Sequence, residues 1–168
     1  MAVIHLVEGP VGAGKSTIAS RLSGEFGAPR FILDDWMATL FRPDRPTMDV
    51  MGWYSERKNR CIDQIWKSTC ELVAAGSDVV LELGLIQRES REQFYDRVND
   101  KAYRLNIYVV DASREVRRER VHSRNKVKGD TFSMEVPDHI FELASEMWEP
   151  ISESECSGHS VTFISTEV

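Results

Sequence analysis

The segment 9-GPVGAGKST-17 constrains the fold more than any other part of the chain. It follows the apolar run 3-VIHLVE-8 and opens the helical pattern of residues 15–25. Its glycines allow a backbone to wrap closely around a phosphate, which larger side chains would block. The loop amides and the N-terminus of the helix would then present N–H donors and positive dipole to the anion. The pattern G-x-x-x-x-G-K-[ST] in this context predicts a nucleotide phosphate-binding loop.

This P-loop predicts both ligands of the site, ATP and Mg²⁺. Lys15 adds a positive charge at the β- and γ-phosphates, and the hydroxyl of Ser16 is suited to coordinate Mg²⁺. A purely structural glycine-rich turn is disfavoured, since the strand and the helix flank the loop as nucleotide binding requires. We expect the cofactor-binding residues to be Gly9, Val11, Gly12, Ala13, Gly14, Lys15, Ser16 and Thr17.

Short apolar runs alternate with helical patterns along the chain. The expected strands are 3–8, 30–33, 78–83, 103–110 and 160–165. The expected helices are 15–25, 36–41, 53–75, 88–100, 113–126 and 137–148, the last beginning at Pro137. Consecutive apolar positions are typical of parallel strands that are covered on both faces. The alternation predicts a single three-layer α/β/α P-loop NTPase domain over residues 1–168, with a mostly parallel five-stranded sheet and a lid at about 113–136.

Two carboxylates follow the second expected strand, in 31-FILDDWMATLF-41. In a parallel sheet the carboxyl ends of the strands line the ligand crevice. A carboxylate there could face the γ-phosphate, orient an acceptor hydroxyl and accept its proton. The alternative is that Asp34 or Asp35 serves only as the N-cap of the helix 36–41. Two adjacent Asp residues allow both roles.

Two further sets of charged residues are candidates for the site. Arg117, Arg120 and Arg124 are three or four residues apart and share one helical face, which could cover the phosphates. The alternative is a solvated face on which interleaved glutamates pair with the arginines. Glu82 ends the strand 78–83, where it could hold Mg²⁺ through water or fix a substrate hydroxyl. Gly84, just beyond, could let an acceptor approach the backbone.

A P-loop followed by a strand, two Asp residues and an aromatic residue resembles the kinase domain of phage-type polynucleotide kinases. It is also similar to the zeta-toxin and chloramphenicol phosphotransferase group of small P-loop kinases, the AAA_33 group. The resemblance implies that Asp34 is the general base and that Arg120 and Arg124 close over the phosphates. The chain departs from the group's pattern at the end of the strand 78–83, where it has Glu82 instead of the usual Asp.

The composition restricts the partners. The net charge of −6 disfavours extended nucleic-acid binding, which needs clustered excess Lys and Arg. No apolar run approaches the length of a membrane span. Three widely spaced cysteines suggest no disulfide framework, which favours a reducing cytoplasmic location. The segment 125-NKVK-128 carries Lys128 where a guanine-specific switch needs Asp, so a GTPase is disfavoured.

The sequence therefore predicts an ATP-dependent phosphotransferase that acts on a hydroxyl of a small-molecule acceptor. A polynucleotide 5′-hydroxyl and a nucleotide sugar, as for zeta toxins, are alternative acceptors. A nucleotide-binding regulator that is not a kinase is an alternative of another class. The segment 126–136 is expected to be a mobile loop. The loop 42–52, with its flanking aromatic residues, is expected on the acceptor side, and the adenine is expected near residues 148–160.

Overall fold

The computed structural model describes residues 1–129 and 135–167 of the chain. A five-stranded sheet lies at its centre, with strand order β2-β3-β1-β4-β5. All pairings between neighbouring strands are parallel. The strands are β1 (Val3–Glu8), β2 (Arg30–Ile32), β3 (Val79–Glu82), β4 (Arg104–Asp111) and β5 (Ser160–Ser165). The expected α/β architecture is thus confirmed, and every one of the expected strands forms.

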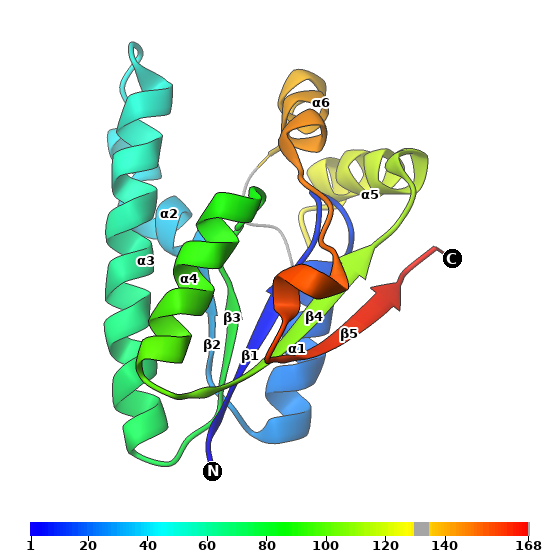
Figure 1. Cartoon of the computed structure of the whole chain (residues 1–168). Helices are drawn as coiled ribbons and strands as arrows, with labels where there is room; N and C mark the ends of the chain where they lie inside the picture. The colour runs from blue at the N-terminus through cyan, green and yellow to red at the C-terminus, as the bar shows by residue number, and fades with distance from the viewer. Residues whose placement is uncertain (130–134, 168) are drawn as a thin grey trace.

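Helices connect the strands and cover both faces of the sheet (Figure 1). The α-helices are α1 (Lys15–Phe26), α2 (Leu33–Leu40), α3 (Val50–Ala74), α4 (Arg88–Asp100), α5 (Arg114–Val127) and α6 (Asp138–Met147). Two short 3-10 helices are η1 (Arg42–Asp44) and η2 (Glu153–Cys156). Among the described residues, no helix combines the length and the apolar character that crossing a bilayer requires.

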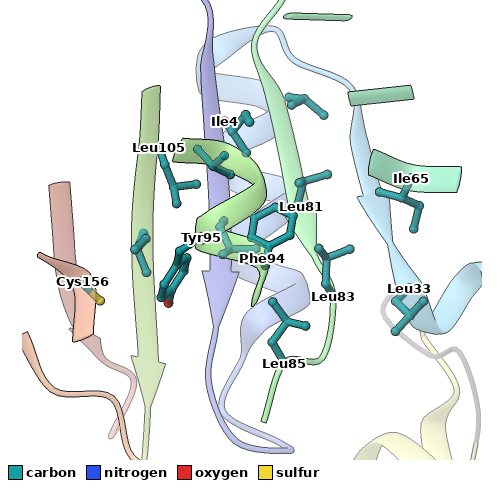
Figure 2. Close-up of a cluster of buried hydrophobic side chains, with 14 of the residues drawn as sticks. Ile4, Leu33, Ile65, Leu81, Leu83, Leu85, Phe94, Tyr95, Leu105 and Cys156 are labelled. Atoms are coloured by element: carbon teal, nitrogen blue, oxygen red, sulfur yellow. The ribbon is translucent and has the colours of Figure 1, made fainter. Parts of the chain in front are cut away.

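The core is divided by the sheet because successive side chains of a strand point to opposite faces. Ile4 and Leu6 of β1 join the larger cluster with residues of α3 and α4, such as Ile65 and Phe94 (Figure 2). Val7 joins the smaller cluster on the other face, where α1 packs. Burial on both faces explains why the strands read as continuous apolar runs rather than alternating ones.

The helix α2 begins earlier than expected, and this corrects the interpretation of the paired carboxylates. Ile32 is the residue that caps the helix, and no side chain caps it. Asp34 and Asp35 both lie inside the first turn. The expectation that one of them is the N-cap is therefore wrong. Their charges instead face the positive end of the helix dipole, which favours acidic residues in the first turn.

Helices α5 and α6 form a separate layer above the carboxyl end of β4 (Figure 1). Glu142 of α6 accepts hydrogen bonds from Arg114 and Arg118 of α5, and Phe141 packs with Val121. Pro137 precedes α6 as its cap rather than starting it, because its ψ of 155° is extended. Residues 130–134 of the loop expected to be mobile lie outside the described residues.

Candidate active site

Lys15 lies at the centre of the P-loop, folded back over the loop backbone. Its Nζ donates hydrogen bonds to the carbonyl oxygens of Gly9, at 2.9 Å, and Pro10, at 3.0 Å. Burial lowers the pKa of Lys15, while the charges of Glu82 and Asp34 act in the opposite direction. Among the described residues, the hydrogen-bond acceptors of this desolvated ammonium are neutral carbonyls. Such a group gains from an anion, so the loop is suited to a phosphate.

The glycines of the loop are required by its close packing. A Cβ atom on Gly9 would lie 2.2 Å from the carbonyl oxygen of Val110, at the end of β4. One on Gly12 would lie 2.7 Å from the carbonyl oxygen of Arg117, in α5. Gly12 also has a φ of 78°, which side-chain-bearing residues rarely adopt. Backbone contacts thus exclude a larger residue at Gly9 and Gly12, and the φ of 101° favours glycine at Gly14.

Ser16 and Glu82 bring a hydroxyl and a carboxylate together beside Lys15. Ser16 Oγ donates to Glu82 Oε2 at 3.1 Å, and Glu82 is only 6% exposed. Burial raises the pKa of Glu82, and the charge of Lys15 opposes that effect. These are the hard oxygen donors that Mg²⁺ prefers. Within residues 1–129 and 135–167, no three acidic, His or Cys side chains converge, so a bound Mg²⁺ would depend on phosphate and water oxygens as well.

Asp34 lies at the carboxyl edge of the sheet, exposed to solvent in the first turn of α2. Burial lowers the pKa of Lys15 and of Lys58 in α3, and the negative charge of Asp34 opposes this effect; burial raises the pKa of Glu82, and Asp34 adds to that rise. Asp35 also acts on Glu82, but more weakly than Asp34 does. Asp34 is therefore the carboxylate of the pair that is electrostatically coupled to the P-loop lysine.

Lys58 is a member of this constellation that the sequence did not indicate. Its Nζ donates to the carbonyl oxygen of Gly84 at 2.9 Å, just after β3. Burial lowers the pKa of Lys58, and nearby Asp34 opposes this effect. Tyr54, one helical turn earlier, has its pKa raised to about 12 by burial and then by Asp34. The contact joins residues 26 positions apart, so no local pattern could have revealed it.

Two arginines of α5, Arg117 and Arg120, turn toward the P-loop. Arg117 is buried and donates to the carbonyl oxygen of Val11 at 3.0 Å. Arg120 donates to the carbonyl oxygen of Ala13 at 3.3 Å. Arg124 is half-buried, its charge acts on Lys15, and its Nε has no hydrogen-bond partner among the described residues. An unsatisfied buried guanidinium nitrogen beside a phosphate-binding loop is a donor available for a ligand.

The end of β5 completes the rim of the loop. Thr166 Oγ1 donates to the carbonyl oxygen of Ala13 at 2.6 Å and accepts from Arg120 at 2.8 Å. Helix α5, the expected lid helix, and the end of β5 therefore meet at Thr166. The adenine was expected near the segment 148–160, but residues of this segment contact α4. Arg91 of α4 holds it through the carbonyl oxygen of Glu149 and the carboxylate of Glu155.

The loop 42–52 does not gather its apolar residues into a pocket. Met48 is 81% exposed and Met51 is 61% exposed. Trp36 instead packs edge-on against Phe31, with ring centroids 5.9 Å apart. The guanidinium of Arg57 lies over the ring of Trp53, at 4.7 Å from its centroid. The aromatic residues that flank this loop therefore contact Phe31 and Arg57, while its methionines are exposed to solvent.

Glu8, the last residue of β1, is a buried carboxyl directly before the P-loop. Tyr95 donates to its Oε2 at 2.8 Å, and its Oε1 has no partner among the described residues. Burial raises the pKa of Glu8 to about 8, although the hydrogen bond from Tyr95 and the charge of Arg91 oppose the change. The folded protein therefore favours the neutral carboxyl.

This burial predicts a pH dependence of stability. Between pH about 4.5 and about 8 the unfolded chain has released the Glu8 proton while the folded chain retains it. The free energy of unfolding therefore falls as pH rises through this window, by about 1.4 kcal/mol for each unit of pKa difference at most. We expect Glu8→Gln to flatten the profile measured by urea denaturation. A profile as steep in Glu8→Gln as in wild type, or flattened equally by Glu25→Gln at an exposed site, would contradict this assignment.

Comparison with known proteins agrees with this geometry. A family model described as an AAA domain, AAA_33, matches residues 4–150. The chain belongs to the AAA_33 family. This is one of the small P-loop kinase groups that the sequence resembles. Among curated proteins, none matches the chain by sequence.

Three solved structures show how far the fold of this AAA_33 chain is shared. A candidate kinase from Chloroflexus aurantiacus superposes with a TM-score of 0.75 at 15% identity, covering 98% of this chain and 85% of the other. A gluconokinase from Sinorhizobium meliloti gives 0.58 at 17% identity, covering 98% and 82%. Chaetomium thermophilum Kti12, in complex with ADP-AlF3, gives 0.62 at 15% identity, covering 95% and 88%. At these identities the likeness establishes the P-loop kinase-like fold alone.

Proposed function

We propose that this protein is an Mg²⁺- and ATP-dependent kinase that transfers the γ-phosphate to a hydroxyl of a small-molecule acceptor. The observation that carries the proposal is the coupling of Asp34 to the P-loop. Its charge acts on both Lys15 and Glu82, at the edge of the sheet where ligands bind in such folds.

Each residue has a defined role in the proposed transfer. Lys15 would leave the carbonyls of Gly9 and Pro10 and bind the β- and γ-phosphates. Ser16 and Glu82 would hold Mg²⁺, directly or through water. When bound, the metal ion would neutralise charge on the phosphate oxygens. Asp34 would orient the acceptor hydroxyl and accept its proton as the oxygen attacks the γ-phosphorus, whose bond to the bridging oxygen breaks so that ADP leaves.

The arginines of α5 would act on the charge of the transferred group. Arg124 is suited to this role because its Nε is unsatisfied and its charge already acts on Lys15. Arg120 would have to exchange its contacts with Ala13 and Thr166 to reach a phosphate. Closure of these side chains over the phosphates would exclude water and favour transfer over hydrolysis.

Isotope transfer tests the proposal. The protein would be incubated with Mg²⁺ and γ-labelled ATP in a deproteinised cell extract, with Lys15→Met as the control. We expect wild type to move label onto a discrete small molecule and Lys15→Met to lose this activity, because the charge on the β- and γ-phosphates is lost. Label found only in inorganic phosphate would contradict a kinase and favour a regulator that hydrolyses ATP. Label on nucleic acid would replace the small-molecule acceptor by a polynucleotide.

A further inference from the structure

Lys58 has an environment that its one hydrogen bond does not account for. It belongs to α3 and its side chain is half-buried, with the carbonyl oxygen of Gly84 as its only hydrogen-bond acceptor among the described residues. None of the ion pairs found in the described part of the chain includes Lys58. A desolvated ammonium is costly unless it is paired, and one neutral carbonyl replaces little of its lost hydration.

Lys58 lies at the carboxyl end of β3, the strand that pairs with β1 and so lies beside the P-loop. Gly84 follows Glu82, so the contact places Nζ at the carboxyl end of β3. Nζ also lies 3.9 Å from the point that a Cβ atom on Gly84 would occupy. The positive charges of Lys15 and Lys58 act on one another, and Asp34 acts on both. Two ammonium groups thus share a region in which the exposed carboxylate is that of Asp34.

We propose that Lys58 binds an anionic group of the acceptor, so that the substrate is a small alcohol carrying its own carboxylate or phosphate. The inference rests on the proposed kinase function and adds the chemical class of its acceptor. Lys15 would hold the phosphates of ATP, while Lys58 would hold the acid group of the acceptor. Asp34 would then face the hydroxyl between them. The charge on the acceptor would form the close ion pair that Lys58 does not make with any described residue.

The first arm of the test determines the charge of the acceptor. A cell extract is ultrafiltered to remove nucleic acids and proteins, then separated on an anion exchanger into retained and unretained pools. Each pool is incubated with the protein, Mg²⁺ and γ-labelled ATP. We expect label to be transferred only in the retained, anionic pool. Transfer confined to the unretained pool, or to the nucleic acids set aside, would overturn the inference while leaving kinase activity in place.

The second arm assigns the charge preference to Lys58, with the labelled compound as substrate. For Lys58→Met we expect KM for the acceptor to rise about tenfold to hundredfold, as for loss of a charge-assisted hydrogen bond, with KM for ATP within about twofold of wild type. Lys58→Arg should recover part of the loss. Lys67→Met, at an exposed lysine of the same helix, should match wild type. Thermal denaturation of each variant verifies its folding.

Other results would overturn the assignment of Lys58 to the acid group of the acceptor. An unchanged acceptor KM in folded Lys58→Met would show that the lysine only ties α3 to Gly84. A rise in KM for ATP instead would place Lys58 on the nucleotide. Should wild type label no pool at all, the proposed kinase function would fail and this inference with it, an outcome distinct from labelling of a neutral acceptor.

Discussion

Asp34→Asn is expected to reduce phosphate transfer by about 100- to 10,000-fold, the range for removal of a general base. The amide keeps the size of the carboxylate but cannot accept the proton of the acceptor hydroxyl. Binding of ATP should be unchanged or slightly tighter, because a negative charge that acts on Lys15 is removed. Steady-state transfer rates and the Kd of a fluorescent ATP analogue would measure the two effects separately.

Asp35→Asn is the matched control for this substitution. It lies in the same turn of α2 and acts more weakly on Glu82. We expect it to retain transfer within about threefold of wild type, since it would not touch the reacting atoms. Equal losses in both variants would contradict the assignment of the base to Asp34, and a loss in Asp35→Asn alone would move that role to Asp35.

The second large effect concerns the stability of the fold. Arg91 is fully buried in α4 and forms an ion pair at 2.7 Å with Glu155, whose side chain is 1% exposed. It also donates to the carbonyl oxygens of Leu85, at 3.1 Å, and Glu149, at 2.8 Å. Arg91→Met would leave the buried carboxylate of Glu155 with only the more distant guanidinium of Arg88, at 4.0 Å, among the described residues. We expect the free energy of unfolding to fall by about 3–5 kcal/mol.

Thermal denaturation would measure this change as a decrease in Tm of about 6–20 °C, given the usual sensitivity of a domain of this size. Arg97→Met, at a partly exposed residue of the same helix, should leave Tm nearly unchanged because solvent screens its pairing with Asp63. The double variant Arg91→Met with Glu155→Met should recover part of the loss. An Arg91→Met variant as stable as wild type would contradict this prediction, because Glu155 would then not depend on Arg91 for compensation of its charge.

The local patterns of the sequence predicted the fold well. The P-loop is a contiguous motif between a strand and a helix, and the strands are apolar runs with both faces buried. The observed ends of some helices and strands differ from the predicted ones, because tertiary contacts decide those ends. Asp78 was expected to begin a strand, but its carboxylate accepts from Val3 N at 2.8 Å and contacts His5 at 3.0 Å. The strand β3 therefore begins at Val79.

The site was harder to predict because its contacts join distant elements. The contact of Lys58 with Gly84 depends on how α3 lies along the end of β3. Arg91 and Glu155 are 64 residues apart, and neither carries a local signature. The start of α2 was missed since the chain passes from strand to helix without a capping side chain. Those features follow from packing, which periodicity does not encode.

The central claim, transfer of the γ-phosphate to an acceptor hydroxyl, is tested most directly by following the reaction with ³¹P NMR. Wild-type protein, Mg²⁺ and ATP would be mixed with the small-molecule extract, and the γ-phosphorus signal followed with time. Our account predicts that each γ-phosphate lost appears as a new phosphomonoester, with little inorganic phosphate. Release of inorganic phosphate alone, at a rate that Asp34→Asn does not change, would contradict it.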